Sequence, residues 1–149
     1  MNRDWIELLA ALNAQGVEYL IVGAHALAAH GHVRATKDLD VWVRPSRENA
    51  ARVIRALREF NAPLHDLSEV DLATPGLVFQ IGVPPLRIDV ITAIDGVRFE
   101  AAWPDRITVR MGETPVFILS RRDLIANKRA SGRLQDLADL ERLEGLGDG

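Results

Sequence analysis

The sequence predicts an α/β (α+β) fold, in which helices flank a mixed β-sheet within a single domain over residues 1–149. Short runs rich in Val, Ile and Leu recur along the chain and are typical of buried strands. Longer runs between them carry apolar residues at helical spacing. Two of the β-rich pairs are joined by connections too short for a helix, so parts of the sheet are expected to be antiparallel.

The elements can be placed in order from these periodicities and from the residues that end them. Gly16 and Gly132 each follow an apolar helical run, and Ser46 and Ser120 each precede one as expected N-caps. Ser120 to Asp123 resembles a capping box. The expected elements are a helix at 3–15, a strand at 17–22, a short helix at 24–29, a strand at 38–44, helices at 47–60 and 68–72, paired strands at 77–83 and 86–92, a short helix at 98–103, a hairpin at 107–111 and 115–119, and helices at 121–131 and from 134.

Composition limits the class of protein. The 149 residues are 48% hydrophobic and 26% charged, which suits a soluble globular domain. A net charge of −3 argues against sequence-independent binding along a nucleic acid. With no cysteine, the chain has neither disulfides nor thiolate metal sites. No apolar run has membrane-spanning length and no signal-peptide pattern is present, so we expect a cytoplasmic protein without a membrane partner.

Two acidic residues stand out in the strand at 38–44. Asp38 and Asp40 are two positions apart, so both side chains point to one face, while Leu39, Val41 and Val43 point to the other. Acidic residues are poor strand formers, and their simplest structural role here is to prevent aggregation at an exposed edge of the sheet. Two neighbouring carboxylates also repel each other, and a divalent cation would remove that repulsion. Oxygen ligands favour Mg²⁺ or Mn²⁺.

A glycine turn precedes this pair and can bind an anion. The strand at 17–22 runs into Gly23, and a short run of small residues follows from Ala24. A junction of strand, glycine and helix directs unpaired backbone N–H groups to one point. An anion at this turn and a metal at Asp38 and Asp40 together describe a site for a metal–nucleotide phosphate.

These motifs resemble the DNA polymerase beta-like nucleotidyltransferases. The stretch VGAHALAAHGHVRATKDLDVWV is most similar to the small bacterial branch that includes aminoglycoside nucleotidyltransferases and AbiEii-type toxins. One departure is Ala24, which stands where the family motif has a second glycine or a serine. The resemblance implies a minimal nucleotidyltransferase fold and transfer of a nucleoside monophosphate from an NTP to an acceptor hydroxyl, with Mg²⁺ or Mn²⁺ as cofactor.

Asp89 is the candidate for a third carboxylate of this site. It interrupts the strand LRIDVIT and shares a face with Arg87 and Ile91. In the family a third carboxylate completes the metal site or takes the proton of the acceptor hydroxyl. A salt bridge to Arg87 is the structural alternative. Three crowded carboxylates raise one another's pKa, so each Asp→Asn variant is expected to be at least as stable as the parent without metal.

Other side chains are candidates for nucleotide binding, and each also has a structural alternative. Arg34, Thr36 and Lys37 lie in the loop before the acidic pair and can meet a triphosphate, or belong to a solvated loop. His25 can touch phosphate, although packing is favoured. The resemblance implies that Lys128 reaches the phosphates with Asp136 orienting it, and the alternative is a basic helix face paired with acids. The predicted nucleotide-binding set is Gly23, Ala24, His25, Arg34, Thr36, Lys37 and Lys128.

Two further classes of function remain open from the sequence. Ala24 and the short chain favour a catalytically silent member that acts as a toxin–antitoxin component or binding module. An Asp-x-Asp pair also holds metal and sugar nucleotide in glycosyltransferases, although the glycine turn before the pair is not their pattern. The acceptor is open among a small molecule, an RNA end and a protein.

Overall fold

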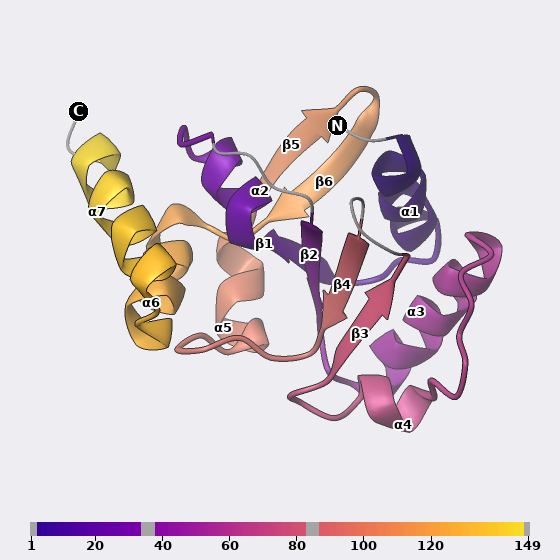
Figure 1. The fold of residues 1–149 in the computed structure, drawn as a ribbon. Helices are drawn as coiled ribbons and strands as arrows, with labels where there is room; N and C mark the ends of the chain where they lie inside the picture. The colour runs from indigo at the N-terminus through magenta and orange to yellow at the C-terminus, as the bar shows by residue number, and fades with distance from the viewer. Residues whose placement is uncertain (1–2, 34–37, 83–86, 148–149) are drawn as a thin grey trace.

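A six-stranded mixed β-sheet with helices around it forms the centre of the computed structural model, which describes residues 3–33, 38–82 and 87–147 (Figure 1). The predicted fold class is confirmed. In Figure 1, helices α1, α3 and α4 group on the right and α2, α5, α6 and α7 on the left. The elements are α1 (Arg3–Ala14), β1 (Tyr19–Val22), α2 (Gly23–Ala29), β2 (Asp38–Val43), α3 (Arg47–Glu59), α4 (Glu69–Leu72), β3 (Val78–Ile81), β4 (Arg87–Ile91), α5 (Phe99–Ala102), a 3-10 turn (Trp103–Asp105), β5 (Ile107–Met111), β6 (Thr114–Ile118), α6 (Arg121–Ser131) and α7 (Leu134–Gly147).

The strand order is β3-β4-β2-β1-β6-β5. Strand β2 pairs antiparallel with β1 and parallel with β4, and β1 pairs parallel with β6. The predicted antiparallel pair is confirmed as β3 and β4, and the predicted hairpin as β5 and β6. Each of these pairs joins strands that are neighbours in sequence, whereas the parallel pairs bring together distant segments.

The two faces of β2 are chemically opposite, as its alternation predicts. Leu39, Val41 and Val43 have no exposed surface and belong to the hydrophobic core. Asp38 and Asp40 lie on the other face and are partly exposed. Burial of the apolar face fixes the register of the strand, because a slip of one residue would bury both carboxylates.

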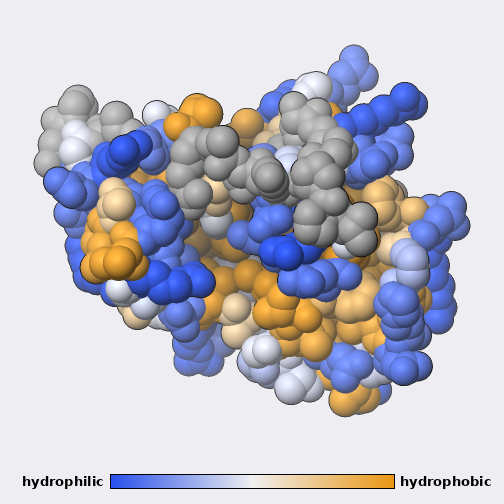
Figure 2. Space-filling model, in the orientation of Figure 1, coloured by the Kyte–Doolittle hydropathy of each residue, from blue (hydrophilic) through white to orange (hydrophobic). Residues whose placement is uncertain are grey.

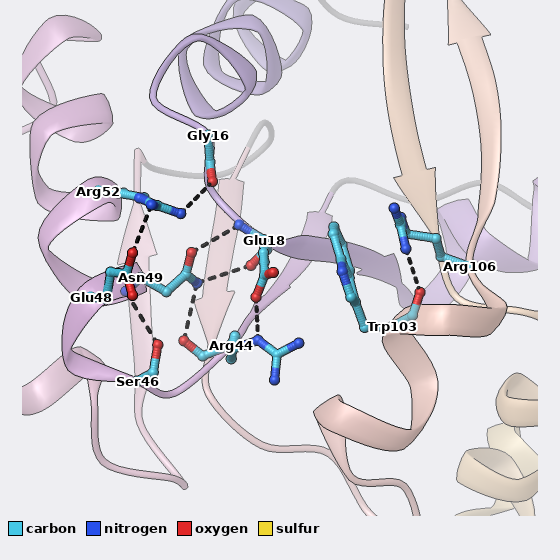
Figure 3. Close-up of polar contacts among 9 residues, drawn as sticks. All are labelled: Gly16, Glu18, Arg44, Ser46, Glu48, Asn49, Arg52, Trp103 and Arg106. Carbon is cyan, nitrogen blue, oxygen red and sulfur yellow. Dashed lines mark hydrogen bonds and ion pairs between the residues drawn. The ribbon is translucent and has the colours of Figure 1, made fainter.

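A buried asparagine joins three elements near the other end of this strand. Asn49 of α3 accepts a hydrogen bond from the Glu18 N–H at 2.8 Å and donates to the carbonyl oxygens of Glu18 and Arg44 at 3.0 and 3.1 Å (Figure 3). The residue is 3% exposed. One amide thus satisfies backbone groups before β1 and after β2, and it fixes α3 against both strands.

Helix ends follow the predicted caps, with small differences in the bounds. Ser46 and Ser120 each accept a hydrogen bond from the backbone N–H three residues later, and Gly132 ends α6 with a φ of +64°. At residues 98–103 the helix is only α5, and the chain continues as a 3-10 turn through Pro104. Strand β1 begins later than predicted, because the Val17 N–H still bonds to the Leu12 carbonyl at the end of α1.

Candidate active site

Strand pairing brings three aspartates together on one face of the sheet. Asp38 and Asp40 lie on β2, and Asp89 of β4 is the direct partner of Asp40 in the parallel pair. Directly paired residues project to the same side of a sheet. The carboxylates predicted from strand alternation in two separate segments therefore converge, and the convergence depends on the register between β2 and β4.

Arg87 lies among these carboxylates and neutralises part of their charge. It is the direct partner of Asp38 in the same strand pair. Its Nη2 is 3.0 Å from Asp38 Oδ2, and its Nε is 3.1 Å from Asp89 Oδ1. The salt bridge considered as the structural alternative for Asp89 is thus present alongside the convergence of the acids. The contact of Arg87 with Asp38 was not foreseen, because it depends on the register of the strand pair.

Asp40 carries the electrostatic cost of this arrangement. Burial, followed by the charges of Asp89 and Asp38, raises the pKa of the Asp40 carboxyl from 3.8 to about 6, although Arg87 and Lys128 act in the opposite direction. Burial also raises the pKa of Asp89, against the lowering effect of Arg87. The site therefore holds more negative charge than its own cations balance, and an added cation would be bound favourably.

The carboxylate oxygens of the site suit a hard cation, but Arg87 already engages two of the three carboxylates. Carboxylate oxygens are the ligands that Mg²⁺ and Mn²⁺ prefer. Within residues 3–33, 38–82 and 87–147, no three acidic or histidine side chains are arranged as ligands of one metal ion. Asp38 and Asp89 are instead both engaged by the guanidinium. A metal would need Arg87 to withdraw from both.

Gly23 forms the turn that brings α2 close to the carboxylates. Its φ is +69°, and a Cβ atom at this position would lie 2.3 Å from Asp40 Oδ2. Only glycine fits both constraints. Ala24 follows and is nearly buried, and α2 spans just seven residues. The close approach to Asp40 accounts for the glycine by itself, so binding of phosphate at this turn remains a prediction.

Lys128 reaches the same site from helix α6. Its side chain is 5% exposed, and Nζ lies 3.1 Å from both Asp136 Oδ1 and Asp139 Oδ2 of α7. Burial would raise the pKa of Asp136, but hydrogen bonds from Ser131, Lys128 and Arg133 outweigh it and lower that pKa. Two acidic side chains thus hold a buried ammonium group in a fixed position.

Asp139 had no assigned role in the sequence analysis. Its spacing of three residues from Asp136 on a helix is the available signal, because residues three apart lie on one helix face.

Two adjoining clefts open onto these groups. A cleft of about 530 Å³ and a smaller one of about 290 Å³ share Gly23, Asp38, Asp40, Lys128, Arg133 and Asp136 as lining residues. Asp89 lines the larger one. Figure 2 shows that a hydrophilic area borders directly on a hydrophobic one in the middle of this face. The volume is in the range of small-molecule sites.

Of the remaining predicted residues, His25 is described by the structure, and it is not brought to this site. His25 packs edge-on against Trp5, with ring centroids 4.9 Å apart, and burial lowers the pKa of its imidazole. Among the described residues that line the two clefts, His25 is absent. Arg34, Thr36 and Lys37 lie outside the described residues, so the structure says nothing about their predicted contacts.

Sequence comparison places the chain in a family of the class that this fold and site suggest. Residues 4–144 match the family described as "Nucleotidyltransferase of unknown function (DUF6036)". The chain belongs to this nucleotidyltransferase family, and the predicted superfamily is confirmed. A search among curated proteins finds no match.

Solved structures with similar folds carry the same class of description. The antibiotic-resistance factor ANT(2'')-Ia is 16% identical with a TM-score of 0.63, and the match covers 100% of this chain and 86% of that one. A candidate nucleotidyltransferase from Thermotoga maritima is 14% identical with a TM-score of 0.54, covering 95% and 88%. An antigenic nucleotidyltransferase-like protein from Paracoccidioides brasiliensis is 15% identical with a TM-score of 0.50, covering 98% and 78%. At these identities the likeness concerns the fold.

No helix in the described part of the chain combines the length and the apolar character needed to cross a bilayer.

Proposed function

We propose that the protein is a metal-dependent nucleotidyltransferase, which moves a nucleoside monophosphate from an NTP to an acceptor hydroxyl. In this reaction a bond forms between the acceptor oxygen and the α-phosphorus. The bond from the α-phosphorus to the bridging oxygen breaks, and pyrophosphate leaves. Transfer of this kind depends on positioning and on charge neutralisation more than on covalent work by the protein.

The convergence of Asp38, Asp40 and Asp89 beside a buried lysine is the observation that supports this proposal. The acids come from β2 and β4, and Lys128 comes from α6 on the other side of the same cleft. Carboxylates for a cation and a cation for phosphates are the two requirements of a metal–nucleotide site. Membership of a nucleotidyltransferase family supports the same function.

Asp38, Asp40 and Asp89 would hold Mg²⁺ or Mn²⁺ once Arg87 has withdrawn. The bound metal would supply charge neutralisation at the phosphates and a lower pKa for the attacking hydroxyl. Asp89 is the candidate to accept the hydroxyl proton, because burial raises its pKa toward the range of a general base. Lys128, which Asp136 and Asp139 hold in place, would meet the phosphates, and the Gly23–Ala24 turn is the candidate cradle for them.

Thermal denaturation with nucleotides tests the proposal. Mg²⁺ or Mn²⁺ with ATP, GTP, CTP or UTP should raise the melting temperature, because a ligand that binds only the native state adds stability by mass action. EDTA should cancel the shift if the metal is required. If none of the four nucleotides changes the melting temperature, the proposal that the protein binds nucleotides fails.

A catalytically silent member of the family is the second candidate, and one observation favours it. Arg87 already satisfies Asp38 and Asp89 without a metal, and Ala24 replaces the glycine or serine of the motif. Such a protein would act as a toxin–antitoxin component or as a binding module. Calorimetric titration with Mg·NTP separates the two candidates, since the silent protein should show no heat of binding.

A further inference from the structure

The larger cleft has two chemically unlike halves. Both cationic side chains among its described lining residues, Lys128 and Arg133, come from the α6–α7 side. Another part of the lining is apolar and consists of Val78, Ile91, Ala93 and Ile94, which we call the apolar wall. Val78 is 59% exposed, although it is a large hydrophobic side chain. Such exposure inside a cleft is typical of a surface that a ligand covers.

The sheet order places the Gly23 turn and Val78 at opposite ends of the candidate site. The Gly23 turn follows β1, the carboxylates lie on β2 and β4, and Val78 begins β3. Strands in a sheet are spaced by about 4.8 Å, so β1 and β3 are about 14 Å apart. Val78 is the direct partner of Ile91 in β4, two residues beyond Asp89. The apolar wall therefore adjoins the carboxylates on the side away from the turn.

The geometry of phosphoryl transfer assigns the leaving group and the acceptor to different ends of the site. The attacking and leaving oxygens lie roughly in line through the α-phosphorus. If pyrophosphate leaves on the side of Gly23 and Lys128, the acceptor approaches from the side of Asp89 and Val78. A proton released by the acceptor then passes to Asp89, which lies between the wall and the metal-binding pair.

We propose that the acceptor is a small hydroxyl compound with an uncharged apolar body, which packs on the apolar wall. This inference rests on the proposed function and specifies its second substrate. An RNA end would need cations along this wall, and the described lining residues supply them only on the α6–α7 side. A polycationic acceptor would instead be held by the acids beside the wall, Asp38, Asp40, Asp89 and Asp95, and the experiment below distinguishes it from an apolar one.

Methyl NMR can test where acceptor-like probes bind. The protein is labelled at Ile and Val methyl groups and saturated with Mg²⁺ and a non-hydrolysable ATP analogue. The probes are 2-phenylethanol, kanamycin and a short RNA with a free 3′-hydroxyl, which represent an apolar, a polycationic and a polyanionic acceptor. We expect saturable shifts of the Val78 and Ile91 methyl signals with 2-phenylethanol.

Charged substitutions at Val78 distinguish apolar contact from electrostatic attraction. Val78 lies on an edge strand and is exposed, so both Val78→Asp and Val78→Lys should fold. Both should weaken 2-phenylethanol binding by about tenfold, because each removes one apolar contact regardless of charge sign. Val70→Asp and Val70→Lys are matched controls, because Val70 is 56% exposed and lies on α4 outside the cleft. They should leave binding unchanged.

Several results would overturn the inference. One is a lack of saturable shifts with 2-phenylethanol, and another is saturation of the Val78 and Ile91 signals by kanamycin or the RNA at a lower concentration than by 2-phenylethanol. A third is loss of the 2-phenylethanol shifts only when the ATP analogue is present, which would assign the wall to the nucleobase. If Mg·NTP stabilises the protein but 2-phenylethanol gives no shifts at the apolar wall, the inference about the acceptor fails and the proposed function stands. If no nucleotide raises the melting temperature, the proposed function fails, and the acceptor role fails with it.

Discussion

At the scale of single residues, the three site aspartates are not equivalent. Asp38 and Asp89 each lie within 3.1 Å of Arg87, whereas burial and then the charges of both neighbours raise the pKa of Asp40. The expectation that every Asp→Asn variant is at least as stable as the parent therefore needs revision. The expectation holds for Asp40→Asn. Asp38→Asn and Asp89→Asn would each remove an ion pair with Arg87 along with a repulsion.

Asp40→Asn should stabilise the metal-free protein at neutral pH. The pKa of Asp40 is about 6 in the folded protein and 3.8 ordinarily, so its stabilising contribution is full below pH 3.8 and is lost as pH rises through 6. After a discount for partial exposure, the gain at pH 7.5 should be about 1–2 kcal/mol. Urea denaturation at pH 4 and pH 7.5 measures it. The exposed Asp66→Asn is the control, and an equal gain there would contradict the assignment.

Arg87→Gln should make the stability of the protein dependent on metal. Without the guanidinium, three carboxylates face one another, and the free energy of unfolding should fall by about 1–2 kcal/mol, since these groups are only partly buried. Mg²⁺ alone should restore more stability to the variant than to the parent, because it no longer competes with Arg87. Melting curves with Mg²⁺ and with EDTA test this. Arg98→Gln, which breaks an exposed pair with Glu100, should show no such rescue.

The residue types of the site could be read from the sequence, but several of their partners could not. Alternation along the strand at 38–44 was enough to assign Asp38 and Asp40 to one face. The bridge from Arg87 to Asp38 required the parallel register of β2 and β4, which joins residues 49 positions apart. Local patterns carry no information on such a register, because it is set by the packing of both strands in the core.

At the scale of elements, Asn49 connects α3 to the strands that carry the site. Asn49→Ala would leave the Glu18 N–H and two buried carbonyl oxygens without their side-chain partner. We expect a loss of about 2–3 kcal/mol in the free energy of unfolding. Chemical denaturation measures it, with the exposed N-cap variant Ser68→Ala, which should cost about 1 kcal/mol, as the comparison. Equal losses would mean that the buried amide has no special role.

Element types were more predictable than their connections. The hairpin at β5 and β6 and the pair at β3 and β4 follow from short runs with tight connections, since local turns determine both. By contrast, the position of β1 between β2 and β6 depends on contacts between distant segments. The same limit applied in part to Lys128: the resemblance pointed to Asp136 as its partner, whereas Asp139 became visible only when α7 was placed against α6.

At the scale of the whole molecule, the candidate site is assembled from all parts of the chain. Gly23 and the paired acids come from the first third, Asp89 from the middle, and Lys128 from α6 near the C-terminal end. The last contributors, Asp136 and Asp139, hold the buried ammonium group of Lys128 from α7.

This dependence on α7 has a consequence for the newly made protein. A nascent chain on the ribosome can pair its strands and bring its three carboxylates together before α7 has emerged from the exit tunnel. Until then, Lys128 has no acidic partner on α7 and must stay in contact with water. The charge balance of the site is therefore completed only when α7 is available, and a translation product that stops before Asp136 should contain the carboxylates without a correctly held lysine.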